Sequence, residues 1–148
     1  MNGILLDSNV ISELRKPETR QDPVLSAWAS RSDFRNTYIS VVTIFEIEIG
    51  ILRIKRHDSL QAKVLEQWFK EKVLSVYRGR ILNITTDIAR SAAALQTPDV
   101  HQISDAFIAA TALCHNLALA TRNMKDFLNT GVRIVNPWDP DAPPLSFC

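Results

Sequence analysis

Short apolar runs alternate with longer helical patterns along this chain. Five runs have the length and composition of buried strands, namely residues 3–7, 38–41, 81–84, 117–121 and 132–135. Apolar residues recur at helical spacing in six further segments: 8–14, 24–28, a stretch beginning at Thr43, 58–77, 86–97 and 103–115. Strands separated by helices pair in parallel through right-handed crossovers. The pattern therefore predicts an α/β fold of three layers, α/β/α, with a central parallel sheet of about five strands.

We expect a single domain over residues 1–148. The 148 residues, 46% of them hydrophobic, suffice for one core. Pro137, Pro140, Pro143 and Pro144 are expected to end the ordered part, which leaves a Pro-rich tail from about residue 137. No apolar stretch has the length of a membrane span, and the N-terminus lacks the pattern of a signal peptide. We therefore expect a cytoplasmic protein that does not associate with a membrane.

The two cysteines predict no disulfide framework. Cys114 lies in an apolar helical stretch and is expected to be a buried small hydrophobe, and Cys148 is a residue of the tail. Neither has the spacing of a metal ligand.

Three carboxylates stand where an apolar run meets a turn or the start of a helix. Asp7 ends the first run, Glu46 follows the second, and Asp105 opens the Ala-rich segment 103–112. In an open α/β sheet the ligand crevice lies beyond the carboxyl ends of the strands, where these acids are expected to converge. Such a cluster is too negative to stand without a cation, and carboxylate oxygens are the ligands that Mg²⁺ prefers. The sequence therefore predicts a magnesium site.

Each acid also has a purely structural interpretation. Thr43 and Glu46 have the spacing of a capping box, in which the glutamate bonds back to the amide of the cap. Asp105 falls in a first helical turn, where the helix dipole favours negative charge. Asp7 can form an Asx-turn at the end of its strand. The convergence of all three acids on one edge of the sheet favours the metal site over these alternatives.

Basic residues concentrate in the middle of a chain whose net charge is only +1. Residues 53–80 hold eight Lys or Arg against three acids, and the segments on either side are net negative. This distribution suits contact with a phosphate backbone, but a solvated helix face gives the same count. The sequence leaves both interpretations open.

Four segments, in order, resemble the motifs of PIN domains. They are Asp7-Ser8-Asn9-Val10-Ile11-Ser12-Glu13, Ser40-Val41-Val42-Thr43-Ile44-Phe45-Glu46-Ile47-Glu48-Ile49-Gly50, Asp105-Ala106-Phe107-Ile108-Ala109-Ala110-Thr111-Ala112, and Leu119-Ala120-Thr121-Arg122-Asn123-Met124-Lys125-Asp126-Phe127 with Asn136-Pro137-Trp138. The last is similar to the end of VapC and FitB-like toxins in particular. The resemblance covers nearly the whole chain. It implies a Mg²⁺- or Mn²⁺-dependent ribonuclease, the toxin of a bacterial toxin–antitoxin pair, with Asp7, Glu46 and Asp105 as its catalytic and metal-binding acids.

One position departs from the pattern of the family. Many relatives have an acid where this chain has Asn123, whose neutral amide weakens any second metal site. Asp126 lies about one helical turn further on and can supply the missing carboxylate if the segment coils there. A surface aspartate that caps a short turn is the alternative.

The remaining candidates surround the acids. Ser8, Asn9 and Thr121 are expected to orient the carboxylates, with Asn123 as a secondary candidate. Arg15, Arg53, Arg56 and Arg122 are the candidates for holding an RNA backbone. The histidines occur singly, which gives little support to a mechanism based on a histidine pair. A metal-activated water is instead expected to leave 5′-phosphate and 3′-hydroxyl ends.

The resemblance implies a cognate antitoxin and a homodimer, with a larger toxin–antitoxin assembly as a further state. Two other functions remain in view: a non-catalytic module that acts in complex with an antitoxin, and a housekeeping nuclease that processes RNA or DNA. Three intact acids favour catalysis over the first, and the compact length favours a toxin over the second. Nothing in the sequence names the RNA target.

Overall fold

A five-stranded parallel sheet forms the centre of the described structure, a computed structural model that covers residues 3–146. The strands are β1 (Ile4–Leu6), β2 (Thr37–Ser40), β3 (Ile81–Leu82), β4 (Ala118–Ala120) and β5 (Ile134–Val135). They lie in the order β3-β2-β1-β4-β5, and every neighbouring pair is parallel. The strand order reverses between β1 and β4, which makes the carboxyl ends of these two strands the switch point where such sheets bind ligands.

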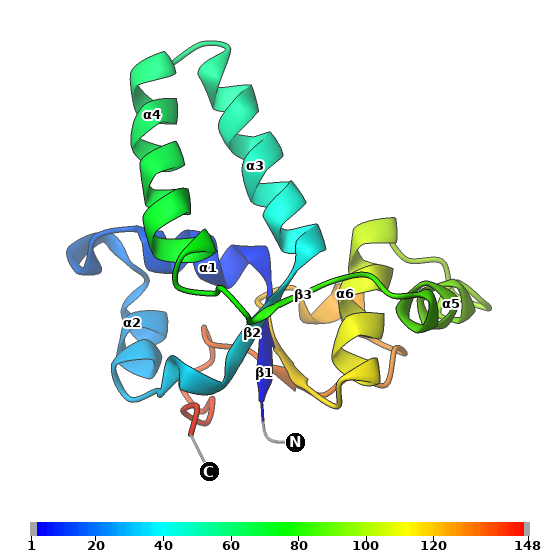
Figure 1. The fold of residues 1–148 in the computed structure, drawn as a ribbon. Helices are drawn as coiled ribbons and strands as arrows, with labels where there is room; N and C mark the ends of the chain where they lie inside the picture. Colours follow the sequence, from blue (N-terminus) through cyan, green and yellow to red (C-terminus); the bar gives the residue numbers. More distant parts are fainter. Residues whose placement is uncertain (1–2, 147–148) are drawn as a thin grey trace.

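Six α-helices cover the two faces of this sheet within the described residues (Figure 1). They are α1 (Ser8–Arg15), α2 (Pro23–Ser30), α3 (Val41–Lys55), α4 (Ser59–Trp68), α5 (Thr86–Ala94) and α6 (Ile103–Cys114). Alternate residues of β1 face opposite layers: Ile4 and Leu6 pack in the cluster that contains α1 to α4, and Leu5 packs against α6. The predicted three-layer α/β/α fold with five parallel strands is thereby confirmed.

The helices α3 and α4 form a hairpin that extends beyond the sheet (Figure 1). Buried Ile47 and Ile51 of α3 belong to the same core cluster as Ala62 and Leu65 of α4. Sequence periodicity predicted one helix over 58–77, but the α-helix ends at Trp68 and a π-helical turn, η3 (Phe69–Leu74), follows it. Phe69 and Val73 of this turn are buried, so the wider turn keeps apolar side chains on the core face.

The start of α3 differs from the prediction and corrects one interpretation of Glu46. The helix begins at Val41, because Ser40 at the end of β2 acts as its N-cap and its hydroxyl accepts a hydrogen bond from the Val42 N–H at 3.0 Å. Thr43 lies inside the first turn, fully buried, and its hydroxyl has no hydrogen-bond partner among residues 3–146. The capping box of Thr43 and Glu46 is therefore wrong, and Glu46 is free of that structural role.

The Pro-rich tail has no regular secondary structure after β5, but it packs against the body of the protein. The indole N–H of Trp28 donates to the Pro143 carbonyl at 2.8 Å, and Asp33 N donates to the Leu145 carbonyl at 3.0 Å. Leu145 N in turn donates to the Ser32 hydroxyl at 3.0 Å. The expectation that the prolines end the order was wrong beyond residue 137, because a proline carbonyl still satisfies a buried indole donor.

The expectation of a buried Cys114 was also wrong. This cysteine is exposed, since it lies in the last turn of α6 with Leu113, past the run Ile108–Ala112 that packs on the sheet. Cys148 lies outside the described residues. Among residues 3–146 no helix combines the length and the hydropathy that crossing a membrane requires.

Candidate active site

Asp7 stands at the junction of β1 and α1, next to the switch point of the sheet. Its backbone N–H donates to the Ala120 carbonyl of β4 at 3.0 Å, which continues the pairing of the two strands. Its side chain is the N-cap of α1, where Oδ1 accepts from the Ser8 N–H at 2.8 Å. The residue is only 4% exposed. The structure records a bond from Ser8 N and none from the Asn9 backbone, so Asp7 is a buried cap of α1 rather than the predicted Asx-turn.

A hydrogen-bond network fixes the second oxygen of Asp7. Thr121, fully buried after β4, donates its hydroxyl to Asp7 Oδ2 at 2.8 Å, and the Asn9 side-chain amide donates to the same oxygen at 3.3 Å. The Thr121 hydroxyl accepts from Asn9 Nδ2 at 3.2 Å and from Asn123 N at 3.1 Å. Asn9 Oδ1 accepts from Arg122 N at 3.3 Å, so the network also holds the loop after β4.

This arrangement agrees with the predicted supporting roles and refines one of them. Asn9 and Thr121 contact Asp7 through their side chains, and Ser8 contacts it through its backbone. Asn123 joins the network through its backbone N–H, while its side chain is exposed. The sequence prediction concerned the Asn123 amide side chain, for which the structure records no contact with Asp7.

Glu46 occupies the second turn of α3 and meets a different environment. It is half-buried, and its Oε1 atom is buried without a hydrogen-bond partner among residues 3–146. The pKa of Glu46 is raised to about 7, mainly by burial and further by the charges of Asp7 and Asp105, while a hydrogen bond from the Ser8 side chain opposes the rise. A buried carboxylate oxygen without a donor is costly, and a cation or a proton would relieve that cost.

The other acids respond to one another in the same way. Burial is the main cause that raises the pKa of Asp105 to about 6, with the charges of Asp126 and Asp7 adding to it and His101 opposing it. Burial also raises the pKa of Asp7, against the donors Thr121 and Ser8, and Asp126 adds to the rise. Asp7, Glu46, Asp105 and Asp126 therefore form one group of mutually repelling carboxylates.

The residues present fit a hydrated divalent cation better than a closed cage of ligands. Among the described residues, no three His, Cys, Asp or Glu side chains are placed to hold a metal ion directly. Mg²⁺ usually keeps several waters and binds one or two carboxylates directly, which this looser group of acids can provide. The Oε1 atom of Glu46, which is buried without a hydrogen-bond partner among the described residues, is the best candidate for a ligand of such a cation.

Asp126 lies in a short 3₁₀ turn, η4 (Met124–Phe127), so the segment coils as the alternative ligand requires. The alternative, a surface aspartate that caps this turn, agrees with the exposure of Asp126 in the first turn, but Asn123 occupies the N-cap position and no capping bond of the Asp126 side chain is recorded. Asp126 is exposed and lines a pocket together with Asp105. Its contribution to a metal site stays a prediction.

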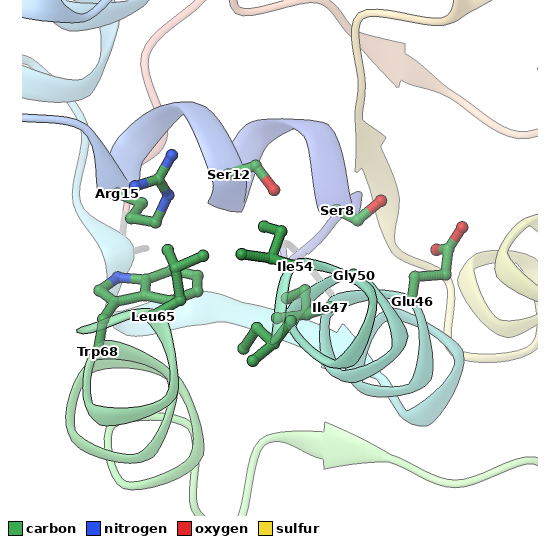
Figure 2. Close-up of a pocket in the computed structure, with 10 residues that line it drawn as sticks. Ser8, Ser12, Arg15, Glu46, Ile47, Gly50, Ile54, Leu65 and Trp68 are labelled. Carbon is green, nitrogen blue, oxygen red and sulfur yellow. The ribbon is translucent and has the colours of Figure 1, made fainter. Parts of the chain in front are cut away.

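A groove runs from Glu46 along α1 toward α4, with a volume of about 250 Å³ (Figure 2). We call it the α1 groove. One side presents Ser8, Ser12 and Arg15, which follow one another on a single face of α1, and the other presents Ile47, Gly50, Ile51, Ile54, Leu65 and Trp68. Sequence analysis did not assign Ser12 or Trp68 to the site. The spacing of Ser8, Ser12 and Arg15 at i, i+4 and i+7 was the available signal.

The predicted RNA-binding arginines are distributed over α1, α3 and the loop after β4. Arg15 lines the α1 groove, and exposed Arg122 lies over the Trp138 ring at 5.4 Å, beside the Asp7 network. Arg53 and Arg56 are exposed at the far end of α3. At a rise of about 1.5 Å per residue, Arg53 lies roughly 10 Å along the helix from Glu46, and Arg56 further still.

One member of the basic segment 53–80 has a structural role instead. The Arg80 guanidinium donates to the carbonyls of Phe34, Thr37 and Val76, at 3.1, 2.7 and 3.0 Å, and lies over the Tyr77 ring. Arg80 keeps its charge, but these contacts occupy the N–H donors with which it would bind a phosphate.

The described fold and this group of acids define a class, and comparison with known proteins agrees. Residues 4–132 match the model of the PIN domain, and the chain belongs to this family. It is 34% identical over 145 residues to VapC ribonuclease Y4jK from Sinorhizobium fredii, an alignment that covers 93% of this chain and 99% of that protein. The predicted resemblance to VapC and FitB-like proteins is thereby confirmed.

Two solved structures share the fold at comparable identity. FitAcB from Neisseria gonorrhoeae superposes with a TM-score of 0.82 at 30% identity, covering 91% of this chain and 98% of that one. A toxin–antitoxin complex from Klebsiella pneumoniae gives a TM-score of 0.58 at 30% identity, covering 91% of this chain and 98% of that one.

Proposed function

We propose that this protein is a divalent-metal-dependent endoribonuclease and the toxin of a toxin–antitoxin pair. The observation that carries the proposal is the group formed by Asp7, Glu46 and Asp105, in which burial raises all three pKa values and the charges of neighbouring acids, Asp126 among them, add to each rise. A bound cation would relieve the repulsion between these carboxylates and could then attract the phosphate of the substrate. Membership of the PIN family and the likeness to a VapC ribonuclease direct this chemistry to RNA.

The three acids divide the work according to their surroundings. The network of Asn9 and Thr121 occupies Asp7 Oδ2, which leaves Oδ1, bonded to Ser8 N, with a lone pair for a cation. Glu46 offers Oε1, which has no donor within the described residues. A bound Mg²⁺ or Mn²⁺ would supply the positive charge that activates water and stabilises the charge of the phosphoryl group.

Protons compete with the cation at this site. A Glu46 carboxyl with a pKa of about 7 is half protonated at neutral pH in the metal-free protein, and a protonated carboxyl is a poor ligand. Arg15, at the far end of the α1 groove, is placed to contact the RNA backbone as the strand leaves the acids. In this proposal Glu46 is both a ligand and the group whose ionisation limits metal binding.

The test is RNA cleavage together with direct metal binding. Asp7→Asn and Asp105→Asn are expected to lower the cleavage rate on the order of 10³-fold, because each removes several kcal/mol of charge stabilisation. Calorimetric titration with Mg²⁺ in the absence of RNA should show a matching loss of affinity. Products with 5′-phosphate and 3′-hydroxyl ends are expected, whereas cyclic phosphate ends, or full activity in Asp7→Asn, would reject the mechanism.

We also propose a cognate antitoxin as the partner. The α1 groove supports it: one end holds the carboxylate of Glu46, the other holds Arg15, and the floor between them is apolar. A peptide segment with an Arg or Lys at the Glu46 end and apolar residues along α3 and α4 would cover the acids and replace the cation. Changing that Arg or Lys to Ala should weaken inhibition, and excess Mg²⁺ should relieve it. If inhibition persists after the Ala substitution and in excess Mg²⁺, the antitoxin inhibits by blocking the path of the RNA and not by replacing the cation.

Two further states belong to the same proposal. We expect a homodimer that assembles into a larger complex with the antitoxin, and a cytoplasmic site of action where RNA is accessible. Light scattering of the free protein and of the complex measures the oligomeric state.

A non-catalytic binding module gains nothing from repelling carboxylates. A protein that binds its antitoxin but cleaves no RNA in Mg²⁺ or Mn²⁺ would favour that alternative. Rapid cleavage of precursor transcripts without growth arrest would favour a housekeeping nuclease.

A further inference from the structure

A second hollow opens on the other side of the acids from the α1 groove. It has a volume of about 600 Å³ and lies between the loop that leads into α6 and the segment around η4. We call it the α6 pocket, and its lining includes Asp105, Asp126, His101, Gln102, Lys125 and Asn129. Because Asp105 and Asp126 form part of its wall, whatever occupies the pocket lies directly beside the candidate active site. Its size is within the range of small-ligand sites, about 300–1,000 Å³.

Hydrogen bonds hold both walls of the α6 pocket in place. The Gln96 side chain clamps the backbone of His101 at both ends, accepting from its N–H at 2.7 Å and donating to its carbonyl at 3.1 Å. Asn129 Nδ2 donates to Asp99 Oδ2 at 3.4 Å and so links the two walls. Walls fixed in this way lose little freedom when a ligand enters.

The lining of the α6 pocket offers polar side chains, which can bond the edge of a planar ring, and apolar side chains, which can pack on its face. Gln102 occupies the N-cap position of α6 but makes no capping bond, so its amide is left to donate and accept elsewhere. Lys125 is exposed on the opposite wall and donates only. Val100, Ile103 and Leu128, which are 85%, 71% and 57% exposed, add apolar surface to the same lining.

We propose that the α6 pocket takes one unpaired base of the RNA, adjacent to the scissile phosphate, and that Gln102 and Lys125 contact its edge. This inference rests on the proposed ribonuclease function and extends it to sequence preference. Proteins that recognise RNA sequence bind splayed, unpaired bases by their edges and faces. A strand that crosses the acids would pass from the α1 groove, with Arg15, to the α6 pocket, with Lys125.

The test uses a pool of random single-stranded RNA, the wild-type protein and Mg²⁺, with sequencing of the cleaved ends. Wild type is expected to show a base preference at one position next to the cut. Gln102→Ala and Lys125→Ala should each lower the ratio of cleavage at preferred to disfavoured sequences roughly tenfold, the size of one lost hydrogen bond. Gln61→Ala, which alters an exposed glutamine on α4, is the matched control and should keep the wild-type preference.

Two outcomes separate this inference from the proposed function. Cleavage by wild type without any base preference, or an unchanged preference in both variants, overturns the pocket and leaves the ribonuclease intact. Absence of all cleavage rejects the ribonuclease, and RNA binding then tests the α6 pocket by itself.

The binding experiment uses cross-linking without metal. With EDTA present, RNA that contains 4-thiouridine is expected to cross-link to the peptide of residues 100–103 or 125–129, and cross-links found only elsewhere overturn the proposal. Variants that keep RNA preference but lose inhibition by the antitoxin would assign the pocket to that protein instead.

Discussion

Asp7 and Glu46 contribute to one site, but their surroundings differ in kind. Asp7 is almost fully buried and accepts hydrogen bonds from Ser8, Asn9 and Thr121. Glu46 is half-buried, and its Oε1 atom meets no donor within residues 3–146. The end of β1 is thus preorganised without a metal ion, whereas the start of α3 is held in an unfavourable state that a cation would relieve. The fold alone therefore supports the Asp7 part of the site, whereas the Glu46 part would be completed by a bound cation.

Neutralising the two acids should have opposite effects on the stability of the metal-free protein. Either change removes a negative charge, and the loss of repulsion alone would stabilise the folded protein in both cases. Asp7→Asn, however, replaces a carboxylate oxygen that accepts hydrogen bonds by an N–H₂ group, which faces donors in the folded protein. We expect Asp7→Asn to lower the free energy of unfolding by about 1–3 kcal/mol, the cost of unsatisfied buried groups. Glu46→Gln should raise it by about 1 kcal/mol or less, because solvent screens a half-buried charge. Urea unfolding in EDTA at pH 8 measures both, and a gain in Asp7→Asn would contradict the role of the network.

The network itself can be weakened without touching an acid. Thr121→Val keeps the shape of the side chain and removes the hydroxyl that donates to Asp7 Oδ2. Loss of such a supporting contact is expected to lower Mg²⁺ affinity and cleavage about 10–100-fold. Thr121→Ser restores the hydroxyl and should recover most of the affinity. If Val and Ser variants bind Mg²⁺ equally, packing of Thr121 rather than its hydrogen bond supports the site.

Acid-dependent stability should report Glu46 and Asp105 directly. Folding raises their pKa values from 4.5 to about 7 and from 3.8 to about 6, so the folded protein binds more protons than the unfolded chain across that interval. The contribution of these two groups to the free energy of unfolding, measured in EDTA, is therefore expected to be greatest below pH 4. It should fall as the pH rises to 7. Glu46→Gln should flatten the upper part of this fall, between pH 5 and 7. A slope that is unchanged in that variant would show that Glu46 is not the titrating group.

The smallest expected effect concerns Asn123. Asn123→Asp adds a carboxylate next to Asp126 and Thr121, and we expect Mg²⁺ affinity to rise only a few-fold, since the side chain is exposed and screened. Asp126→Asn should lower affinity by a similar factor, and the double variant should return it toward the wild-type value. Calorimetry that shows equal affinity and stoichiometry in all three variants would remove both residues from the metal site.

The strands could be predicted from the sequence because they depend on short-range pattern. An apolar run that ends in Asp7, Thr121 or Ser40 places a polar group at the rim of a parallel sheet by geometry alone. The start of α3 was misplaced because two residues compete to cap it, and the choice of Ser40 over Thr43 depends on where β2 stops. Local pattern contains no information on that point.

The remaining surprises come from contacts between distant segments. The indole N–H of Trp28 donates to the carbonyl of Pro143, 115 positions away, and the guanidinium of Arg80 donates to the carbonyl of Thr37, 43 positions away. Neither contact has a signature in the local sequence pattern. In each case a side chain is satisfied by a backbone or hydroxyl group that only the tertiary structure brings near.

The place of β1 in the middle of the sheet has a consequence for synthesis of the protein. Of the five strands of the sheet, β1 is synthesised first, whereas one of its two neighbours, β4, is the fourth, at residues 118–120. Pairing over such a separation is expected to form late. A nascent chain that ends before β4 lacks both this partner strand and Thr121, which donates to Asp7. If the proposed function holds, we expect activity on RNA to be withheld from such incomplete chains.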